Sequence, residues 1–196
     1  MGENMLFWIV ICVLFLMINI YQKYFKVKKI HYLFISLFII WSLVFIDNRF
    51  NYLKILIIYL MLFLVMIVDY QNQWIPDLSI IVIGTINLFE LIIVNNLYNI
   101  TNDYSGIVIT LILILLIIFV EIILKKELIG FGDLKLIFVL IINQNILFLS
   151  LLLFMSSLIG IIVYFMNKSK KQLPFAPAIV ISYILLITIK KIVLKM

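Results

Sequence analysis

Two aspartates are the residues in this sequence best suited to chemistry. Asp69 ends one apolar run, and Asp133 follows Gly130-Phe131-Gly132 at the start of another. A carboxylate in or against a bilayer costs about 2.5 to 3.5 kcal/mol on insertion scales, so it suggests a functional site and calls for a partner. Two carboxyl groups a few ångströms apart share a proton: the ionised one can draw a proton from water while the protonated one polarises a carbonyl. The pair therefore suggests hydrolysis of peptide bonds, with the acid and base roles unassigned.

The composition places these aspartates in a membrane protein. Of 196 residues, 67% are hydrophobic and 12% are charged, which is far from the composition of a soluble domain. Backbone in lipid must satisfy its own hydrogen bonds, so an all-α polytopic fold is expected, in one membrane-embedded domain over residues 1–196. The net charge of +6 comes from lysines scattered between apolar runs, so nucleic-acid binding is not expected, and the expected surroundings are a lipid bilayer.

Other catalytic groups are scarce. Cys12 is the single cysteine and His31 the single histidine, and no HExxH or GxSxG pattern occurs. A cysteine zinc site and a disulfide framework cannot be built from these residues. We therefore expect neither a metal nor a cofactor, and an Asp pair needs neither.

The apolar runs predict the helices that must position the aspartates. A helix needs roughly 20 apolar residues to cross a hydrocarbon core of about 30 Å. Most of the 15 lysines and arginines fall in alternate junctions, which the positive-inside rule assigns to the cytoplasm. This orientation puts both termini outside and both aspartates at the cytoplasmic face. About eight transmembrane helices are expected, over residues 5–21, 30–46, 52–69, 78–95, 105–124, 128–142, 146–166 and 176–194.

The sixth predicted helix is the shortest. Residues 133–142 alone span about 15 Å, which cannot cross a membrane. A start near Leu128 makes the segment long enough for a thinned region, with Asp133 lining a water-accessible cavity below the headgroups.

The residues around the two aspartates suit close packing and helix starts. Without Cβ atoms, Gly130 and Gly132 let the backbone pass close to a neighbouring helix or a substrate. On the other side, Pro76 suits the first turn of a helix, and Asp77 beside it lies favourably at the positive end of the helix dipole.

These residues together resemble a known family. Gly130-Phe131-Gly132-Asp133-Leu134-Lys135 is similar to the GxGDxK element of the type IV prepilin peptidases, and Asp69 with Ile75-Pro76-Asp77 resembles their first aspartate and the Ile-Pro-Asp/Asn segment after it. Presenilin-like proteases share GxGD but pair it with Tyr-Asp, whereas Val68 precedes Asp69 here. Order, spacing and membrane placement together make the resemblance strong, and Val68 favours the prepilin group.

Further positions extend the resemblance over about residues 52–194. Glu127 matches an acid that the family often carries before the glycines, and Gly84 and Asn87 match small and polar positions of the intervening helix. Ser156-Ser157-Leu158-Ile159-Gly160 and Pro174-Phe175-Ala176-Pro177 resemble later family elements. In the last of these Ala176 replaces the family's usual glycine.

The resemblance implies an aspartic endopeptidase with Asp69 and Asp133 as its catalytic residues. Its partners would be pilin-like precursors, each cut after a short basic leader and before an apolar helix, at the cytoplasmic face of a bacterial or archaeal cell membrane. Many members insert a cytoplasmic domain with paired CxxC motifs between their first two helices. Only residues 22–29 occupy that place here, so a short form is expected and N-methylation is unsupported.

Several alternatives stay open at this stage. A proton- or ion-coupled transporter or a noncatalytic scaffold could use acids within apolar runs, such as Glu90 and Glu121. Asp133 taken alone could cap a helix, and Asp69 could be an interfacial residue. Lys135 either tunes the charge of the pair or reaches to the headgroups, and Glu127 either shapes the pair or is simply solvated.

Overall fold

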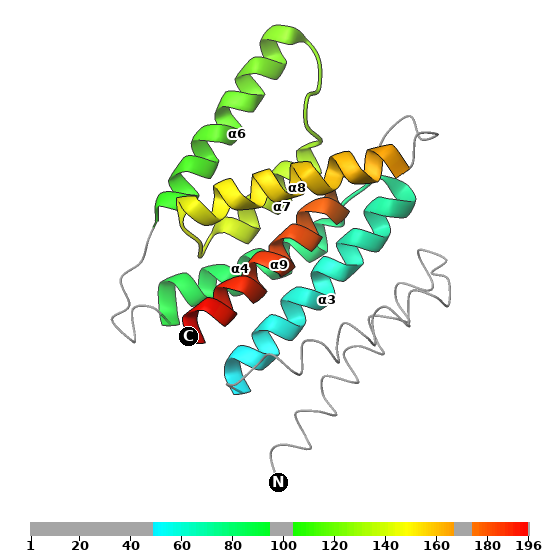
Figure 1. Ribbon diagram of the computed structural model, residues 1–196. Coiled ribbons are helices and arrows are strands. Elements are labelled where there is room, and N and C mark those ends of the chain that lie inside the picture. Colours follow the sequence, from blue (N-terminus) through cyan, green and yellow to red (C-terminus); the bar gives the residue numbers. More distant parts are fainter. Residues whose placement is uncertain (1–48, 95–103, 167–173, 196) are drawn as a thin grey trace. The chain divides into compact units, whose positions relative to one another are not determined.

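The computed structural model describes residues 49–94, 104–166 and 174–195, and in these residues it is helical with no strands (Figure 1). The chain divides into two units, Met1–Ile57 and Ile58–Met196. The predicted helices over 5–21 and 30–46 lie outside the described residues. The architecture below is that of the second unit.

The helices follow the predicted apolar runs closely. Two of them, α6 and α8, have the predicted bounds, because polar junctions flank these runs on both sides. The helices are α3 (Arg49–Asn72), α4 (Asp77–Phe89), the π-helical turn η1 (Glu90–Val94), α6 (Ser105–Leu124), α7 (Phe131–Ile141), α8 (Ile146–Met166) and α9 (Ala176–Lys195).

Residues with special backbone geometry end and start these helices. Gln73 and Lys125 have positive φ angles of 54° and 50°, and they terminate α3 and α6. Pro76, with φ −66° and ψ 120°, precedes α4, and its carbonyl accepts the amide of Ser79 at 3.1 Å. Asp77 then stands in the first turn of α4, as the sequence predicts.

The prediction for the sixth segment is wrong in its bounds. Gly130 is extended, with φ −56° and ψ 130°, so helix α7 begins at Phe131 and not near Leu128. Its 11 residues give about 16 Å, too short to cross a hydrocarbon core of about 30 Å. Asp133 consequently lies in the first turn of a short helix. The count of eight crossings and the external termini remain predictions.

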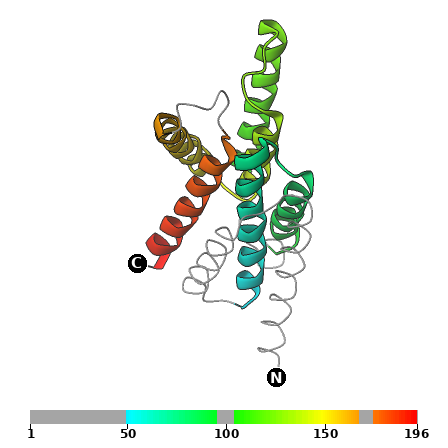
Figure 2. The ribbon, with the colours of Figure 1, turned by 90° about the vertical axis from the view of Figure 1, so that its right-hand side faces the viewer.

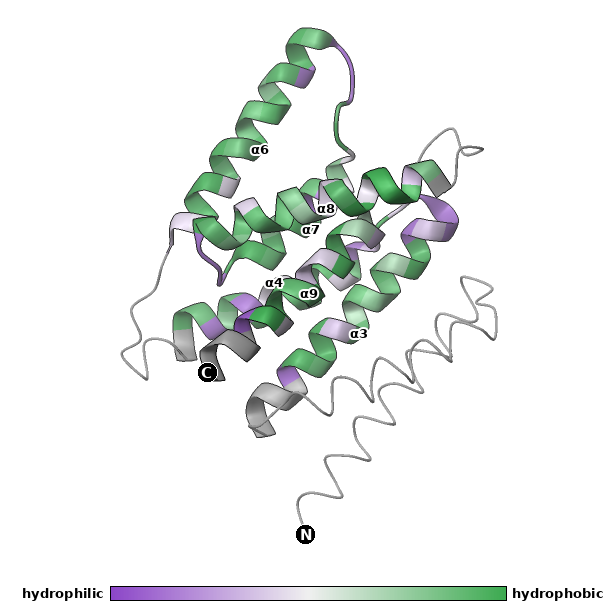
Figure 3. Cartoon of the chain, in the orientation of Figure 1, coloured by the Kyte–Doolittle hydropathy of each residue, from purple (hydrophilic) through white to green (hydrophobic). Residues whose placement is uncertain are grey.

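Three described helices are long and apolar enough to cross a membrane: Lys54–Asn72, Ser105–Leu124 and Ile146–Phe165. Ala176–Lys190 is a shorter apolar helix. Hydrophobic residues cover nearly all of α6 and α8, whereas the chain just after Leu124 is hydrophilic (Figure 3).

The second unit is held together by helix pairs. Helix α8 packs along α9, α4 packs on α7, and α7 also contacts α6 and α9. The core side chains are aliphatic, with Leu62 and Val68 on α3, Leu136 and Leu140 on α7, and Ile179 on α9 fully buried. Helix α6 differs, because its buried residues are Gly106 and Thr110 in its first turns, and its other end extends away from α7 and α8 in both views (Figures 1 and 2).

Candidate active site

Asp69 lies in the last turn of α3, and its carboxylate is buried. The residue is 6% exposed, and its Oδ2 accepts a hydrogen bond of 3.1 Å from the backbone amide of Ala176. Ala176 is the first residue of α9 and is itself fully buried. The first amides of a helix have no partner within the helix and carry its positive end, so they favour an anion. The α9 N-terminus therefore offsets part of the cost of burying a carboxylate at Asp69.

Asp133 lies in the first turn of α7, held by the residue that precedes the helix. The carbonyl of Gly130 accepts the amide of Asp133 at 2.9 Å and that of Leu134 at 3.3 Å. A Cβ atom at Gly130 would lie 3.3 Å from Oδ2 of Asp133, closer than ordinary contact. Glycine thus leaves room for the carboxylate, which a larger residue would push aside by a few tenths of an ångström, while the φ of −56° suits any residue.

The turn after Asp69 contacts the start of α7 directly. A Cβ atom at Gly132 would lie 3.3 Å from the side chain of Ile75, which is 7% exposed. Gly132 therefore lets α7 approach the segment between α3 and α4. Through this contact the end of α3 and the start of α7, each carrying one aspartate, come to the same end of the unit.

The two carboxyl groups interact electrostatically. Burial raises the pKa of Asp133 to about 7, and the negative charge of Asp69 adds to the rise. A group with this pKa is partly protonated at neutral pH. Asp133 is partly exposed, so water can reach it. Two carboxyl groups, one of them partly exposed, thus lie at the same end of the unit and interact through their charges.

The family comparison agrees with this geometry. A model of the type IV leader peptidase family matches residues 56–165, which is more than half of the chain and includes both aspartates. The chain belongs to the type IV leader peptidase family. Searches of curated proteins and of solved structures returned no match.

Membership in the type IV leader peptidase family makes the chain a membrane protease of the leader peptidase type. The matched residues contain α4, α6 and α7 in full and nearly all of α8. The element Pro174-Phe175-Ala176-Pro177 follows the matched range. The hydrogen bond from its Ala176 amide to Asp69 is therefore known from the structure and not from the family match.

Lys135 has a partner that the sequence did not predict. Its Nζ lies 2.9 Å from Oδ1 of Asp77 and 4.9 Å from the ring centroid of Phe131. The bridge joins the Ile-Pro-Asp segment at the start of α4 to the GxGDxK segment on α7. Both side chains are well exposed, so the bridge contributes little stability. Lys135 therefore pairs with Asp77 of the Ile-Pro-Asp segment. Neither expected role, tuning the charge of the aspartates or reaching to the headgroups, included this partner.

Gly84 and Asn87 pack α4 against α7 deeper in the unit. Nδ2 of the buried Asn87 donates a hydrogen bond of 2.8 Å to the carbonyl of Val139. A Cβ atom at Gly84 would lie 3.2 Å from the side chain of Val139. These two family positions thus act at a distance from the carboxylates, by fixing the helix that carries Asp133.

The two acids near the end of α6 lie differently. Glu127 is exposed, and its role stays as the sequence left it. Glu121, one candidate for a proton path, accepts the amides of Leu128 and Ile129 at 2.9 and 3.1 Å. In the described parts of the chain no three His, Cys, Asp or Glu residues are grouped to hold a metal ion.

Proposed function

We propose that this chain is an aspartic endopeptidase that removes the N-terminal leader of type IV prepilin-like precursors at the cytoplasmic face of the membrane. Asp69 and Asp133 form its acid/base pair. One observation carries the proposal: within the range matched by the family, the contact of Gly132 with Ile75 brings the start of α7, with Asp133, to the end of α3, with Asp69. There burial and the charge of Asp69 raise the pKa of Asp133 to about 7. In this proposal the two side chains, from separate helices, share the proton transfers of one reaction.

The surroundings of the two carboxyl groups suggest how the roles divide. Burial acts against the charge of both carboxyl groups, but at Asp69 the hydrogen bond from the Ala176 amide favours the ionised form and offsets part of this cost. Asp133, with a pKa of about 7, keeps a proton for much of the time at neutral pH. Asp69 is therefore proposed as the general base and Asp133 as the general acid.

In this assignment Asp69 takes a proton from water while the water oxygen bonds to the scissile carbonyl carbon. Asp133 donates its proton toward the carbonyl oxygen, which gains the negative charge. When the C–N bond breaks, the proton held by Asp69 goes to the leaving amine and the carbonyl oxygen returns its proton to Asp133. Atoms and charge balance with water as the only added reactant.

The substrate class rests on the family. Leader peptidases of this type act on precursors in which a short basic leader precedes an apolar helix, and such a substrate brings its scissile bond to the membrane surface. The exposed segment Tyr70–Trp74, which follows Asp69 directly in the chain, fits a site that opens to water at that surface.

Leader cleavage tests the proposal directly. A prepilin-like precursor is co-expressed with the wild type, with Asp69→Asn and with Asp133→Asn, and the precursor and product are separated by gel. Both variants are expected to lose cleavage by about 10³-fold or more, because neither can complete the proton transfer. Asp77→Asn is the matched control, since the same chemical change there breaks only an exposed ion pair.

Membrane extraction and thermal unfolding of each variant show whether it remains folded. Full cleavage by both Asn variants, each present in the membrane at the wild-type level, would contradict the aspartate pair.

A further inference from the structure

Glu121 stands where a carboxylate is not expected from helix electrostatics. It lies in the last turn of α6, Ser105–Leu124. The C-terminal end of a helix carries partial negative charge, which disfavours an acid by about 0.3 to 1 kcal/mol. The residue therefore needs a compensating interaction.

The compensation comes from the chain between α6 and α7. Oε1 of Glu121 accepts the amide of Leu128 at 2.9 Å and that of Ile129 at 3.1 Å. Its backbone carbonyl accepts the amides of Lys125 and Lys126, the latter at 3.4 Å. One residue thus binds four amides of the segment Lys125–Gly130, which we call the α6–α7 loop.

Of the two amides that donate to the Glu121 side chain, that of Ile129 lies directly before the GxGD segment. Ile129 is followed by Gly130, whose carbonyl accepts the amide of Asp133 at 2.9 Å. On the other side, Gly132 contacts Ile75 next to the α3 end. The position of Asp133 is thus set from the Asp69 side by Ile75 and from the loop side through Gly130.

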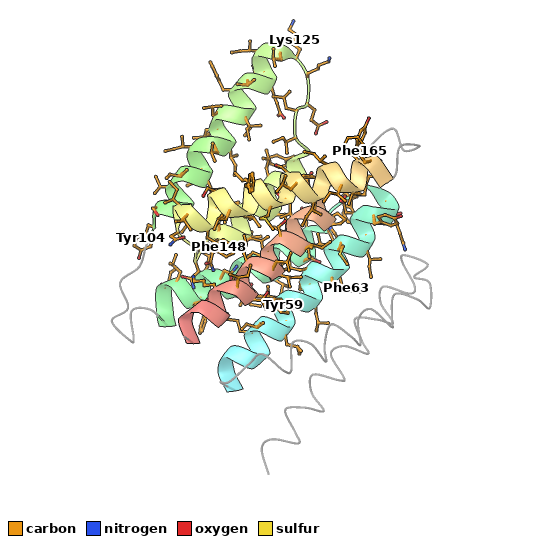
Figure 4. The ribbon with its side chains drawn as sticks, in the orientation of Figure 1. Tyr59, Phe63, Tyr104, Lys125, Phe148 and Phe165 are labelled. Atoms are coloured by element: carbon orange, nitrogen blue, oxygen red, sulfur yellow. The ribbon has the colours of Figure 1, made fainter. Side chains whose placement is uncertain are left out.

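The loop side depends on α6, and the side chains at this end of α6 pack little on the other described helices. The buried residues of the helix are near its start, while Ile122, Ile123 and Leu124 are 55 to 70% exposed. Figure 4 shows Lys125 at the tip of α6, far from Tyr104 at its other end. The α6–α7 loop returns from this tip to α7, and the carboxylate of Glu121 fixes its last residues.

We propose that Glu121 is a positioning residue: it orders the α6–α7 loop and so holds Asp133 at the orientation that proton transfer to the substrate requires. This role rests on the proposed peptidase function. Glu121 is not a catalytic residue, because it acts on the loop backbone and does not face the reacting atoms. Since both amides bind the same oxygen, a neutral amide side chain of equal length can replace it.

Kinetics of purified protein in detergent, with a prepilin-like precursor, separate this role from general stability. Glu121→Ala and Glu121→Asp should each lower kcat by about tenfold to a hundredfold with KM within about twofold, because a displacement of about 1 Å at a catalytic group has effects of this size. Glu121→Gln should keep kcat within about threefold. Ile122→Ala, next in the chain and 70% exposed, is the matched control and should behave as the wild type.

Hydrogen exchange tests the loop without reference to activity. Exchange of the Leu128 and Ile129 amides should be about tenfold faster in Glu121→Ala and Glu121→Asp and unchanged in Glu121→Gln and Ile122→Ala. If Glu121→Ala does not fold, Glu121→Asp, which keeps the charge but not the reach, gives the same comparison.

Two results would overturn the inference: unchanged exchange in the Ala and Asp variants, or loss of activity in Glu121→Gln with its exchange intact. If the wild type does not cleave prepilin-like precursors, the exchange result still decides whether Glu121 orders the loop, while the proposed function fails by itself.

Discussion

The two ends of the second unit are built on different principles. At the aspartate end, defined by Asp69–Asp77, Gly130–Lys135 and Pro174–Pro177, charged and polar groups meet across helix starts and turns. At the opposite end, which we call the closing end, Ser105 and Gly106 pack on the turn Ile142–Asn145. There the contacts involve mainly backbone and small side chains.

The difference shows where function and stability reside. At the aspartate end the buried Asp69 and the partly buried Asp133 interact through their charges, an arrangement that costs folding free energy and that the proposed peptidase would use for chemistry. The closing end has no comparable cost: the Ser105 hydroxyl accepts the Ile146 amide at 3.3 Å, and Lys190 bonds to the side chain of Gln144 at 3.0 Å. Substitutions should therefore affect activity at one end and folding at the other.

The largest loss of stability is expected from Gly106→Ala at the closing end. A methyl group there would overlap the backbone carbonyl oxygen of Gln144, and a backbone group cannot rotate away as a side chain can. The free energy of unfolding should fall by about 3 kcal/mol or more. Thermal unfolding in detergent measures it, with Val108→Ala, exposed on the same helix, as the control. An unchanged melting temperature would refute the distinction between the ends.

A smaller loss is expected from Asn87→Ala, between the two ends. The substitution removes a buried hydrogen bond to Val139 and should cost about 1 to 3 kcal/mol. Thr85→Ala on the same helix is the control, because its exposed hydroxyl bonds only within α4, to Val82, and its loss should cost under about 0.5 kcal/mol. Equal melting temperatures for the two variants would show that the bond to α7 does not hold α4.

At the aspartate end a substitution should instead raise the free energy of unfolding, because Asp133→Asn removes a charge that is costly to bury. A carboxyl whose pKa is raised to about 7 in the folded protein binds more protons there than in the unfolded chain, so stability falls as pH rises from about 4 through 7. The variant should lose this part of the pH dependence and be more stable at pH 8. The full shift corresponds to about 4 kcal/mol, and screening by water at this partly exposed carboxyl should reduce the gain to about 1 to 2 kcal/mol, roughly 2 to 8 °C.

Melting temperatures of both proteins between pH 5 and pH 8 measure this difference. Parallel curves for the wild type and Asp133→Asn would mean that this carboxyl does not carry the raised pKa.

The smallest effect is expected from the ion pair between Lys135 and Asp77. Both side chains are well exposed, at 39% and 63%, so water screens the pair and its coupling energy should be below about 1 kcal/mol. A double-mutant cycle with Lys135→Gln and Asp77→Asn measures it, and added salt should reduce it further. A coupling of several kcal/mol would make this bridge a main support of the aspartate end.

Helix placement was largely predictable because it depends on local composition. The runs 105–124 and 146–166 end at polar residues, and the structure has helices with these bounds. The start of α7 was predicted wrongly, because an apolar run continues through Leu128 and Ile129 while Gly130 takes an extended conformation. Apolar character is needed for a buried helix but does not by itself make a residue helical.

Contacts between segments far apart in the sequence were harder to predict from the sequence. The sequence suggested that Asp69 and Asp133 belong together, from their isolation among apolar residues and from the family resemblance. It offered no sign that the Ala176 amide, 107 positions away from Asp69, would donate to that carboxylate. It also drew attention to Glu121 as an acid in an apolar run, but the amides it binds depend on how the α6–α7 loop folds back.

The sequence by itself determined the membrane class and the helical composition, and it singled out two acids for the proposed hydrolysis, since these follow from residue type and from spacing along the chain. The tertiary structure decided which partner each group has: a helix N-terminus for Asp69, a neighbouring negative charge for Asp133, and Asp77 for Lys135. The physical reason is that hydrogen bonds and charge interactions depend on distance in space, which local sequence leaves open until the helices pack.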